Sequence, residues 1–263
     1  MENKPNRLRA KLNTDGIATG CMIFSWSPNM VEAAAASGID YVRIDAEHAW
    51  RQDGMLEHLI RAADAIGVTS MVRMDNGYPQ LLRKALEIGA GAVLVANVGT
   101  VGEAEAVVDA AKFPPRGSRG FSSYCRSGHW NAVSAPDWIR WSDSEPMVGI
   151  MIEHIEAMEH VDDIMAVDGV DFVNFGPADF ALSLGLDGPD RNEERVHSAF
   201  LRTIEAAQKY DKHVMCNIPT SAEQVRRHVE LGLTILELGF DVDYVRNGLS
   251  VALDAMSSAA SKK

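Results

Sequence analysis

Five times along the chain, an apolar helical run ends at a glycine and a short hydrophobic run follows at once. A glycine adopts the left-handed backbone at a helix end easily, so each position predicts a boundary between a helix and a strand. The hydrophobic runs do not alternate with polar residues, which is typical of parallel strands covered on both faces. The glycines are Gly38, Gly67, Gly89, Gly169 and Gly232, and the runs cover residues 41–44, 70–73, 92–95, 172–175 and 234–238.

Three further hydrophobic runs, at residues 20–24, 147–152 and 213–218, bring the predicted strands to eight. Segments with the periodicity of amphipathic helices lie between them. Eight strands that alternate with helices predict a single (β/α)8 TIM-barrel domain over residues 1–263. The alternative is an open doubly wound sheet. It is disfavoured because SWSPN stands where a glycine-rich phosphate loop would follow the first strand.

Residues 113–146 interrupt this rhythm, because the segment is too long for an ordinary connection. We interpret it either as a packed insertion or subunit contact, or as a lid over a functional site. A helix with apolar positions is predicted over residues 242–256, and it could pack on its own barrel or on another copy of the chain. We expect the small polar tail from about residue 257 to residue 263 to be disordered.

The composition limits the partners of the protein. The chain has 25 Lys and Arg against 37 Asp and Glu, a net charge of −12, so we expect no nucleic-acid partner. No apolar run approaches the roughly 18 residues that a membrane span needs, and the polar N-terminus does not look like a signal peptide. The three cysteines are widely spaced and suggest neither a disulfide framework nor a thiolate metal site. We therefore expect a cytoplasmic protein without a membrane partner.

Polar side chains follow the predicted strands at their carboxyl ends, where a barrel of this type concentrates its chemistry. Such a group of carboxylates at one rim needs a countercharge, and Mg²⁺ or Mn²⁺ is often held by only one or two carboxylates. Glu153 and Asp179 follow adjacent strands and could each supply one ligand oxygen. The residues at the predicted strand ends are Ser25, Asp45, Glu47, His48, Arg73, Asp75, Asn97, Glu153, His154, Asp179, Asn217 and Glu237.

Two of these residues allow more than one interpretation. The planar guanidinium of Arg73 suits an oxyanion or a carboxylate, but it could equally form a salt bridge with Asp45 or Asp75. His48 could act in catalysis or could simply be exposed in a polar loop. We interpret Glu47 as a solvated or supporting residue.

The order of the motifs GIDYVRIDAEHA, MVR, LEIGAGAVLVANV, AKFPPRGSRG, a strand ending in Glu153, and VDFVNFGPADFALSLG resembles the HpcH/HpaI aldolase family over roughly residues 20–239. Its D-x-E-H and G-P-A-D segments make the match specific. The family comprises class II, metal-dependent pyruvate aldolases, among them hydroxy-oxo-heptanedioate and dehydro-deoxyglucarate aldolases. The resemblance implies a divalent cation (Mg²⁺, Mn²⁺ or Co²⁺) and a homo-oligomer, a trimer or hexamer, with the last helix exchanged between subunits.

The resemblance also implies roles for individual residues. Glu153 and Asp179 fall on the metal ligands, His48 on the general base, and Arg73 on the arginine that stabilises the enolate oxygen. The backbone segment expected to receive the pyruvate carboxylate comprises Gly176, Pro177 and Ala178, with Asp179 next to it.

The histidine is expected to be oriented by a carboxylate. Glu87 falls where the family has an aspartate that raises the basicity of the histidine, and Asp45 is the alternative. The sequence departs from the family pattern at Glu87 itself, at Met151 in place of a glutamine, and at Ala96 in place of a proline.

The implied reaction is the reversible aldol cleavage of a 4-hydroxy-2-oxo acid into pyruvate and an aldehyde, through a metal-bound enolate. His48 would take the proton of the 4-hydroxyl group, and Arg73 would stabilise the enolate oxygen. No predicted strand end carries a lysine, which disfavours Schiff-base chemistry. The alternatives are a citryl-type lyase, a phosphonopyruvate-type enzyme, and a non-catalytic barrel that binds an oxo acid.

Overall fold

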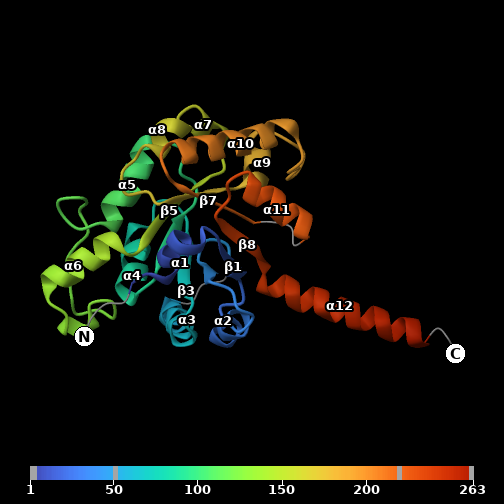
Figure 1. Ribbon diagram of the computed structural model, residues 1–263, viewed down its shortest axis with the longest axis horizontal. Helices are drawn as coiled ribbons and strands as arrows, with labels where there is room; N and C mark the ends of the chain where they lie inside the picture. Colours follow the sequence, from blue (N-terminus) through green and yellow to red (C-terminus); the bar gives the residue numbers. More distant parts are fainter. Residues whose placement is uncertain (1–4, 50–52, 218–220, 261–263) are drawn as a thin grey trace.

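The computed structural model describes residues 5–49, 53–217 and 221–260. Within them, eight parallel strands follow one another in sequence order and close into a barrel (Figure 1). This confirms the predicted (β/α)8 barrel, and the strand ends agree with the sequence to within two residues, except that residue 218 lies outside the described residues. The strands are β1 (Ala18–Ile23), β2 (Tyr41–Asp45), β3 (Thr69–Met74), β4 (Ala92–Val95), β5 (Met147–Ile152), β6 (Phe172–Phe175), β7 (His213–Asn217) and β8 (Ile235–Phe240).

Helices surround the barrel and cover the outer faces of its strands (Figure 1). Their ends use the expected local chemistry. For example, Gly89 ends one helix in the left-handed conformation, and Thr100 begins the next with a capping box closed by Glu103. The helices are α1 (Arg7–Asp15), α2 (Pro28–Ala35), α3 (Asp53–Ile66), α4 (Pro79–Ile88), α5 (Val101–Ala111), α6 (Ala135–Ser144), α7 (Ile155–Met158), α8 (Val161–Met165), α9 (Pro177–Ser183), α10 (Glu194–Lys209), α11 (Ala222–Glu230) and α12 (Asp241–Ala260), with a 3₁₀ turn η1 (His129–Asn131).

Two aromatic rings, with aliphatic and methionine side chains around them, pack inside the amino-terminal half of the barrel. The Tyr41 ring occupies the space beside Gly20, where a Cβ atom would lie 2.4 Å from it. The Phe172 ring does the same beside Gly149, at 2.2 Å. These rings help to close this end of the barrel, and the polar side chains of the candidate site gather at the carboxyl ends of the strands.

The segment 113–146 packs as an insertion beside the barrel, as one of its two interpretations predicted. Phe113, Val133 and Trp138 form a small buried cluster of their own. The buried guanidinium of Arg119 lies 4.6 Å from the centre of the Phe113 ring. Phe121, Tyr124 and Trp130 expose half or more of their surface on the same insertion.

The last helix, α12, projects away from the barrel instead of packing on it (Figure 1). Its start is fixed, because the buried Asp241 carboxylate accepts hydrogen bonds from Phe24 N at 2.9 Å and from Ser25 N at 3.1 Å. Residues 257–260, where disorder was expected, continue this helix, and residues 261–263 lie outside the described part. No helix in the described ranges is long and apolar enough to cross a membrane.

Candidate active site

The loop after β2 is organised by one carboxylate. Asp45 is fully buried and accepts hydrogen bonds from the backbone N–H groups of Glu47 at 3.3 Å, His48 at 3.3 Å and Ala49 at 3.2 Å. The Trp26 indole donates to the Asp45 carbonyl at 2.6 Å and ties the loop after β1 to it. Asp45 thus positions the backbone that carries Glu47 and His48.

Arg73 ends up between two carboxylates from that loop. Its Nε donates to Asp45 Oδ1 at 2.8 Å, and its Nη1 lies 3.2 Å from Glu47 Oε2. Burial alone would raise the pKa of Asp45, but the hydrogen bond and the charge of Arg73 outweigh it and hold this pKa below its ordinary value. The predicted salt bridge with Asp45 is therefore confirmed, whereas Asp75 instead accepts a hydrogen bond from the Asn97 side chain at 2.7 Å.

Glu153 faces this pair from the end of β5. Its Oε1 accepts a 2.7 Å hydrogen bond from the backbone N–H of Asn97, which adopts a left-handed backbone. Burial raises the pKa of Glu153 to about 7; the Asn97 bond opposes this shift, and the charges of Glu47 and Asp179 add to it. A Cβ atom on Gly176 would lie 2.8 Å from the Glu153 side chain, so a glycine there allows the close approach.

These carboxylates fit a divalent cation. Glu47 is nearly buried, and its Oε2 accepts no hydrogen bond of good geometry. Burial also raises the pKa of Glu47. Glu47 and Glu153 are therefore two neighbouring acids whose negative charges are not fully compensated by the protein. In the described ranges, no three His, Cys, Asp or Glu side chains form a complete metal site. Glu153 and Asp179 could still hold an ion such as Mg²⁺, which often takes two carboxylates and leaves its other positions to water and substrate.

The start of α9 offers fewer backbone donors than the sequence suggested. The N–H of Gly176 already donates to the Ile152 carbonyl at 2.9 Å, and Pro177 has no N–H. Ala178 and Asp179, in the first turn, have N–H groups with no acceptor among the described residues. Within the segment expected to receive the pyruvate carboxylate, Ala178 and Asp179 are therefore the residues with backbone N–H groups available.

His48 and Glu87 do not meet within one chain. His48 exposes 58% of its side chain, and its Nε2 lies 3.8 Å from Glu47 Oε2. Glu87 lies near the far end of α4, roughly 12 Å along the helix axis from its start at the carboxyl rim. There it pairs with Arg83 at 3.8 Å and with Lys84 at 3.6 Å. A single chain therefore does not place Glu87 where it could orient His48.

The comparisons with known proteins agree with this geometry. The family model described as "HpcH/HpaI aldolase/citrate lyase" matches residues 19–248. The chain belongs to this family. It is 33% identical to a hydroxypyruvate/pyruvate aldolase of Cupriavidus necator over 82% of this chain and 79% of that protein. In sequence it thus resembles an enzyme that acts on carbon–carbon bonds.

Two solved structures show how closely this HpcH/HpaI family member follows the family fold. The HpcH/HpaI aldolase from Desulfitobacterium hafniense DCB-2 superposes with a TM-score of 0.87 at 27% identity, covering 95% of this chain and 96% of that one. The citrate synthase SbnG superposes equally well, with a TM-score of 0.87 at 29% identity over 98% of this chain and 99% of that one. An aldolase and a citrate synthase thus share this fold, so the fold alone does not determine the reaction.

Glu47 is the site residue that sequence reasoning undervalued, because it was interpreted as solvated or supporting. In the structure it is nearly buried between Arg73 and His48. No signal in the sequence marks this placement, because β2 ends at Asp45 and the alternation of a strand does not extend to Glu47. The tight turn after β2 decides this placement, and residue periodicity does not reveal it.

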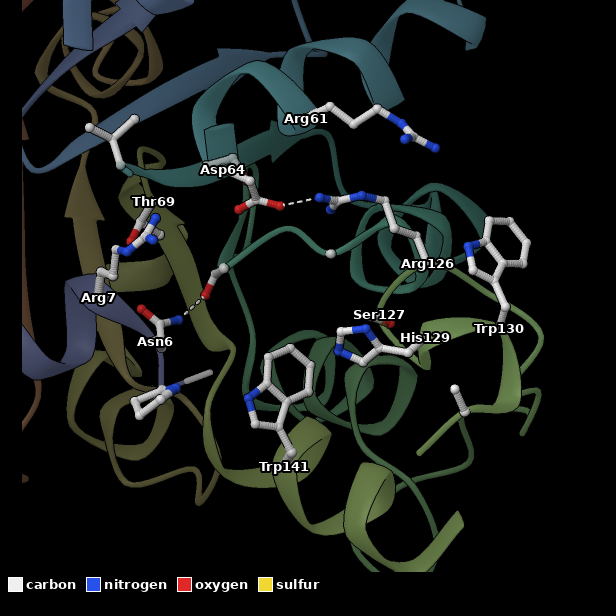
Figure 2. A pocket seen from close by; sticks show the side chains of 16 residues that line it. Asn6, Arg7, Arg61, Asp64, Thr69, Arg126, Ser127, His129, Trp130 and Trp141 are labelled. Carbon is white, nitrogen blue, oxygen red and sulfur yellow. Dashed lines mark hydrogen bonds and ion pairs between the residues drawn. The ribbon is translucent and has the colours of Figure 1, made fainter. Parts of the chain in front are cut away.

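A separate cavity of about 520 Å³ lies at the opposite end of the barrel, around the start of β3 (Figure 2). Arg7, Arg61 and Arg126 line it together with Trp130 and Trp141. Figure 2 shows an ion pair between Asp64 and Arg126, two of the residues that line it. This end of a TIM barrel serves stability rather than chemistry, so the cavity is not the candidate active site.

Proposed function

We propose that this family member is a class II aldolase that reversibly cleaves a 4-hydroxy-2-oxo acid into pyruvate and an aldehyde. The observation that carries the proposal is the buried Glu153, whose pKa is raised to about 7, close to an arginine held between two acids. Such a site favours a divalent cation together with an anionic substrate. The aldolase names of the relatives, such as the enzyme of Cupriavidus necator, support the same reaction class.

Glu153 and Asp179 would hold the cation, which would be Mg²⁺, Mn²⁺ or Co²⁺. When bound, this ion would supply Lewis-acid polarisation of the 2-oxo group. Glu153 fits this role because burial and the nearby charges of Glu47 and Asp179 raise its pKa, so a bound cation would compensate its charge.

The remaining steps belong to the side chains of this chain. The free N–H groups of Ala178 and Asp179 bind the substrate carboxylate. Arg73 is held by Asp45 through Nε, and its Nη2 makes no hydrogen bond among the residues described. That nitrogen donates to the 2-oxo oxygen as negative charge develops there, a stabilisation on the order of 3 kcal/mol.

Proton transfer falls to His48. In cleavage it takes the proton of the 4-hydroxyl group, and in the reverse direction it returns the proton to the new alcohol. Its exposed position suits an aldehyde that enters from solvent, and Asp45 fixes the loop below it. Glu87 contributes to this step only if a second copy of the chain brings it close.

We also propose that the protein assembles as a homo-oligomer, a trimer or hexamer, through α12. A helix of 20 residues with apolar side chains exposed on it is poorly stable alone in water. A second copy of the chain would cover these side chains, which are Val242, Val245, Leu249, Val251, Leu253 and Met256.

Pyruvate release from a panel of 4-hydroxy-2-oxo acids, measured with and without EDTA, tests the proposal. We expect release that EDTA abolishes and that Mg²⁺, Mn²⁺ or Co²⁺ restores. Full activity in EDTA would contradict the role of Glu153 and Asp179. The likeness to a citrate synthase favours one second candidate, carbon–carbon bond formation on a larger carboxylic acid. Product analysis by mass spectrometry separates the two.

A further inference from the structure

Asn97 interrupts the regular backbone at the carboxyl rim, directly beside the candidate site. It follows β4 and has a φ of 57°, a left-handed conformation that few residues besides glycine and asparagine adopt. On either side of it, the N–H groups of Ala96 and Val98 donate to carbonyl groups of β3 and β5. The backbone N–H of Asn97 does not join this pairing, and it donates instead to Glu153 Oε1 at 2.7 Å.

The side chain of Asn97 is held from both neighbouring strands. Its Nδ2 donates to Asp75 Oδ1 at 2.7 Å, in the loop after β3. Because an ionised carboxylate only accepts, this bond fixes the orientation of the amide, and Asn97 Oδ1 accepts from His154 Nε2 at 3.0 Å, directly before α7. The Asn97 carbonyl also accepts a longer bond from Asn76 Nδ2, at 3.4 Å. We name Asp75, Asn97 and His154 the rim tether.

The rim tether determines which oxygen of Glu153 is available to a ligand. Oε1 is occupied by the Asn97 N–H, whereas Oε2 accepts no hydrogen bond from the described residues. Oε2 lies toward the start of α9, because a Cβ atom on Gly176 would lie 2.8 Å from it. Asp179 is in the first turn of that helix. The carboxylate is thus held with one oxygen on Asn97 and the other toward the helix that carries the second acid.

A fixed carboxylate oxygen suits a divalent cation. Mg²⁺ demands near-octahedral geometry, so a carboxylate held in one orientation fits it better than one that rotates. A mobile glutamate would also lose conformational freedom when it binds. Groups that hydrogen-bond a metal ligand therefore affect metal affinity, commonly on the order of ten- to a hundredfold when they are removed. The proposed mechanism assigns no role to any of the three tether residues.

From this geometry we propose that the rim tether positions Glu153 so that it offers one oxygen, Oε2, to the divalent cation. Asn97 is the positioning residue in contact with Glu153, and its two side-chain partners keep its backbone turned. Asp75 contributes more than His154, because its bond is shorter and charge-assisted, whereas His154 is exposed to competing water. The inference rests on the proposed function in taking Glu153 as a ligand of the cation.

The test is the dissociation constant of Mn²⁺ without substrate, measured on the full chain through the electron paramagnetic resonance of the free ion. Asp75→Ala removes the acceptor of the Asn97 amide, and Asn97→Gly removes the amide while still allowing a left-handed backbone. We expect each variant to weaken Mn²⁺ binding by on the order of tenfold.

The conservative variant Asp75→Asn separates the hydrogen bond from the charge. It loses the charge of Asp75 just as Asp75→Ala does, but its amide oxygen can still accept from Asn97 Nδ2. We therefore expect its Mn²⁺ affinity to stay within about threefold of the native value. Asp75 and Asn97 are only partly buried, so these variants should fold, and their thermal unfolding without Mn²⁺ checks this.

Asp109→Ala is the matched control. Asp109 also accepts a side-chain hydrogen bond, from Ser118 Oγ, but it lies near the end of α5 that is far from the carboxyl rim. Its loss removes one charge and one hydrogen bond and should leave Mn²⁺ binding unchanged.

The possible outcomes separate the inference from the proposed function. Native Mn²⁺ affinity in Asp75→Ala and Asn97→Gly, with binding still lost in Glu153→Gln, would overturn the inference alone. Equal losses in Asp75→Ala and Asp75→Asn would also overturn it, because the charge of Asp75 would then act directly. If Glu153→Gln binds Mn²⁺ as the native protein does, or if neither binds it, the proposed cation site fails together with the inference. Tether-dependent Mn²⁺ binding without pyruvate release would contradict the proposed reaction and support the inference.

Discussion

Replacing Glu153 by glutamine should separate the stability of this protein from its chemistry. The residue is 3% exposed, and burial raises its pKa to about 7 from the ordinary 4.5. A glutamine has nearly the same shape, and its Oε1 can still accept the 2.7 Å hydrogen bond from Asn97 N. The Glu153→Gln variant therefore removes the charge while leaving the packing in place.

The sign and size of the effect follow from the two pKa values. In the unfolded chain this carboxyl loses its proton near pH 4.5, whereas in the folded chain it keeps the proton until about pH 7. Below pH 4.5 both states are protonated, and the group does not affect folding. As the pH rises from 4.5 to about 7, the folded state becomes less stable relative to the unfolded state. Above pH 7 the full cost of ionising the buried Glu153 carboxyl is present. The gap corresponds to roughly 3 kcal/mol of unfolding free energy.

Urea unfolding in EDTA at pH 5 and at pH 8 measures this penalty. We expect Glu153→Gln to be more stable than the native protein by about 2–3 kcal/mol at pH 8, and by less than about 1 kcal/mol at pH 5. The same variant should lose pyruvate release, because a neutral amide is a poor ligand for Mg²⁺. Glu156→Gln, an exposed acid on α7, is the control and should show no pH-dependent gain. An equal effect at both pH values would refute the reasoning.

Three further predictions concern the site and the assembly. Arg73→Lys should keep the charge beside Asp45 but lose the planar fork, so kcat should fall by on the order of 10²–10³ with little change in Tm. Gly176→Ala should lower both Tm and activity, because its Cβ would lie 2.6 Å from Met151 Cε; Gly102→Ala, with open space around it, should lower neither. Deleting residues 242–263 should turn an oligomer into a monomer by light scattering, and an unchanged mass would contradict the role of α12.

The strands and many helix ends of the fold could be predicted from local sequence patterns. Each predicted strand is a continuous hydrophobic run, because helices cover one side of it and the barrel interior the other. Glycines such as Gly89 and Gly169 mark helix ends because a left-handed backbone is needed there. The insertion was recognised by its length, but its packing around Trp138 was not, because that depends on contacts between residues far apart in sequence.

The candidate site was recovered in part. Asp45, Arg73, Glu153 and Asp179 were expected at the carboxyl rim, and the structure brings them to it. Glu87 was expected beside the histidine, but helix direction carries it toward the opposite end of the barrel. The motif match gives Glu87 a role but does not say that this residue reaches His48 of the same chain.

By itself, the sequence determined that this chain forms a parallel barrel and which side chains stand at its carboxyl rim. The barrel follows from continuous hydrophobic runs between amphipathic helices, and the rim residues are the polar ones directly after those runs, so both depend on the local pattern of the chain. The tertiary structure alone decided that Glu47 is nearly buried, that the Gly176 N–H donates to the Ile152 carbonyl, and that Arg43 pairs with Glu237. Burial and pairing depend on strand register and on the course of the loops. Both bring together residues that are far apart in the sequence. These contacts set the charges and the unpaired groups on which the chemistry rests.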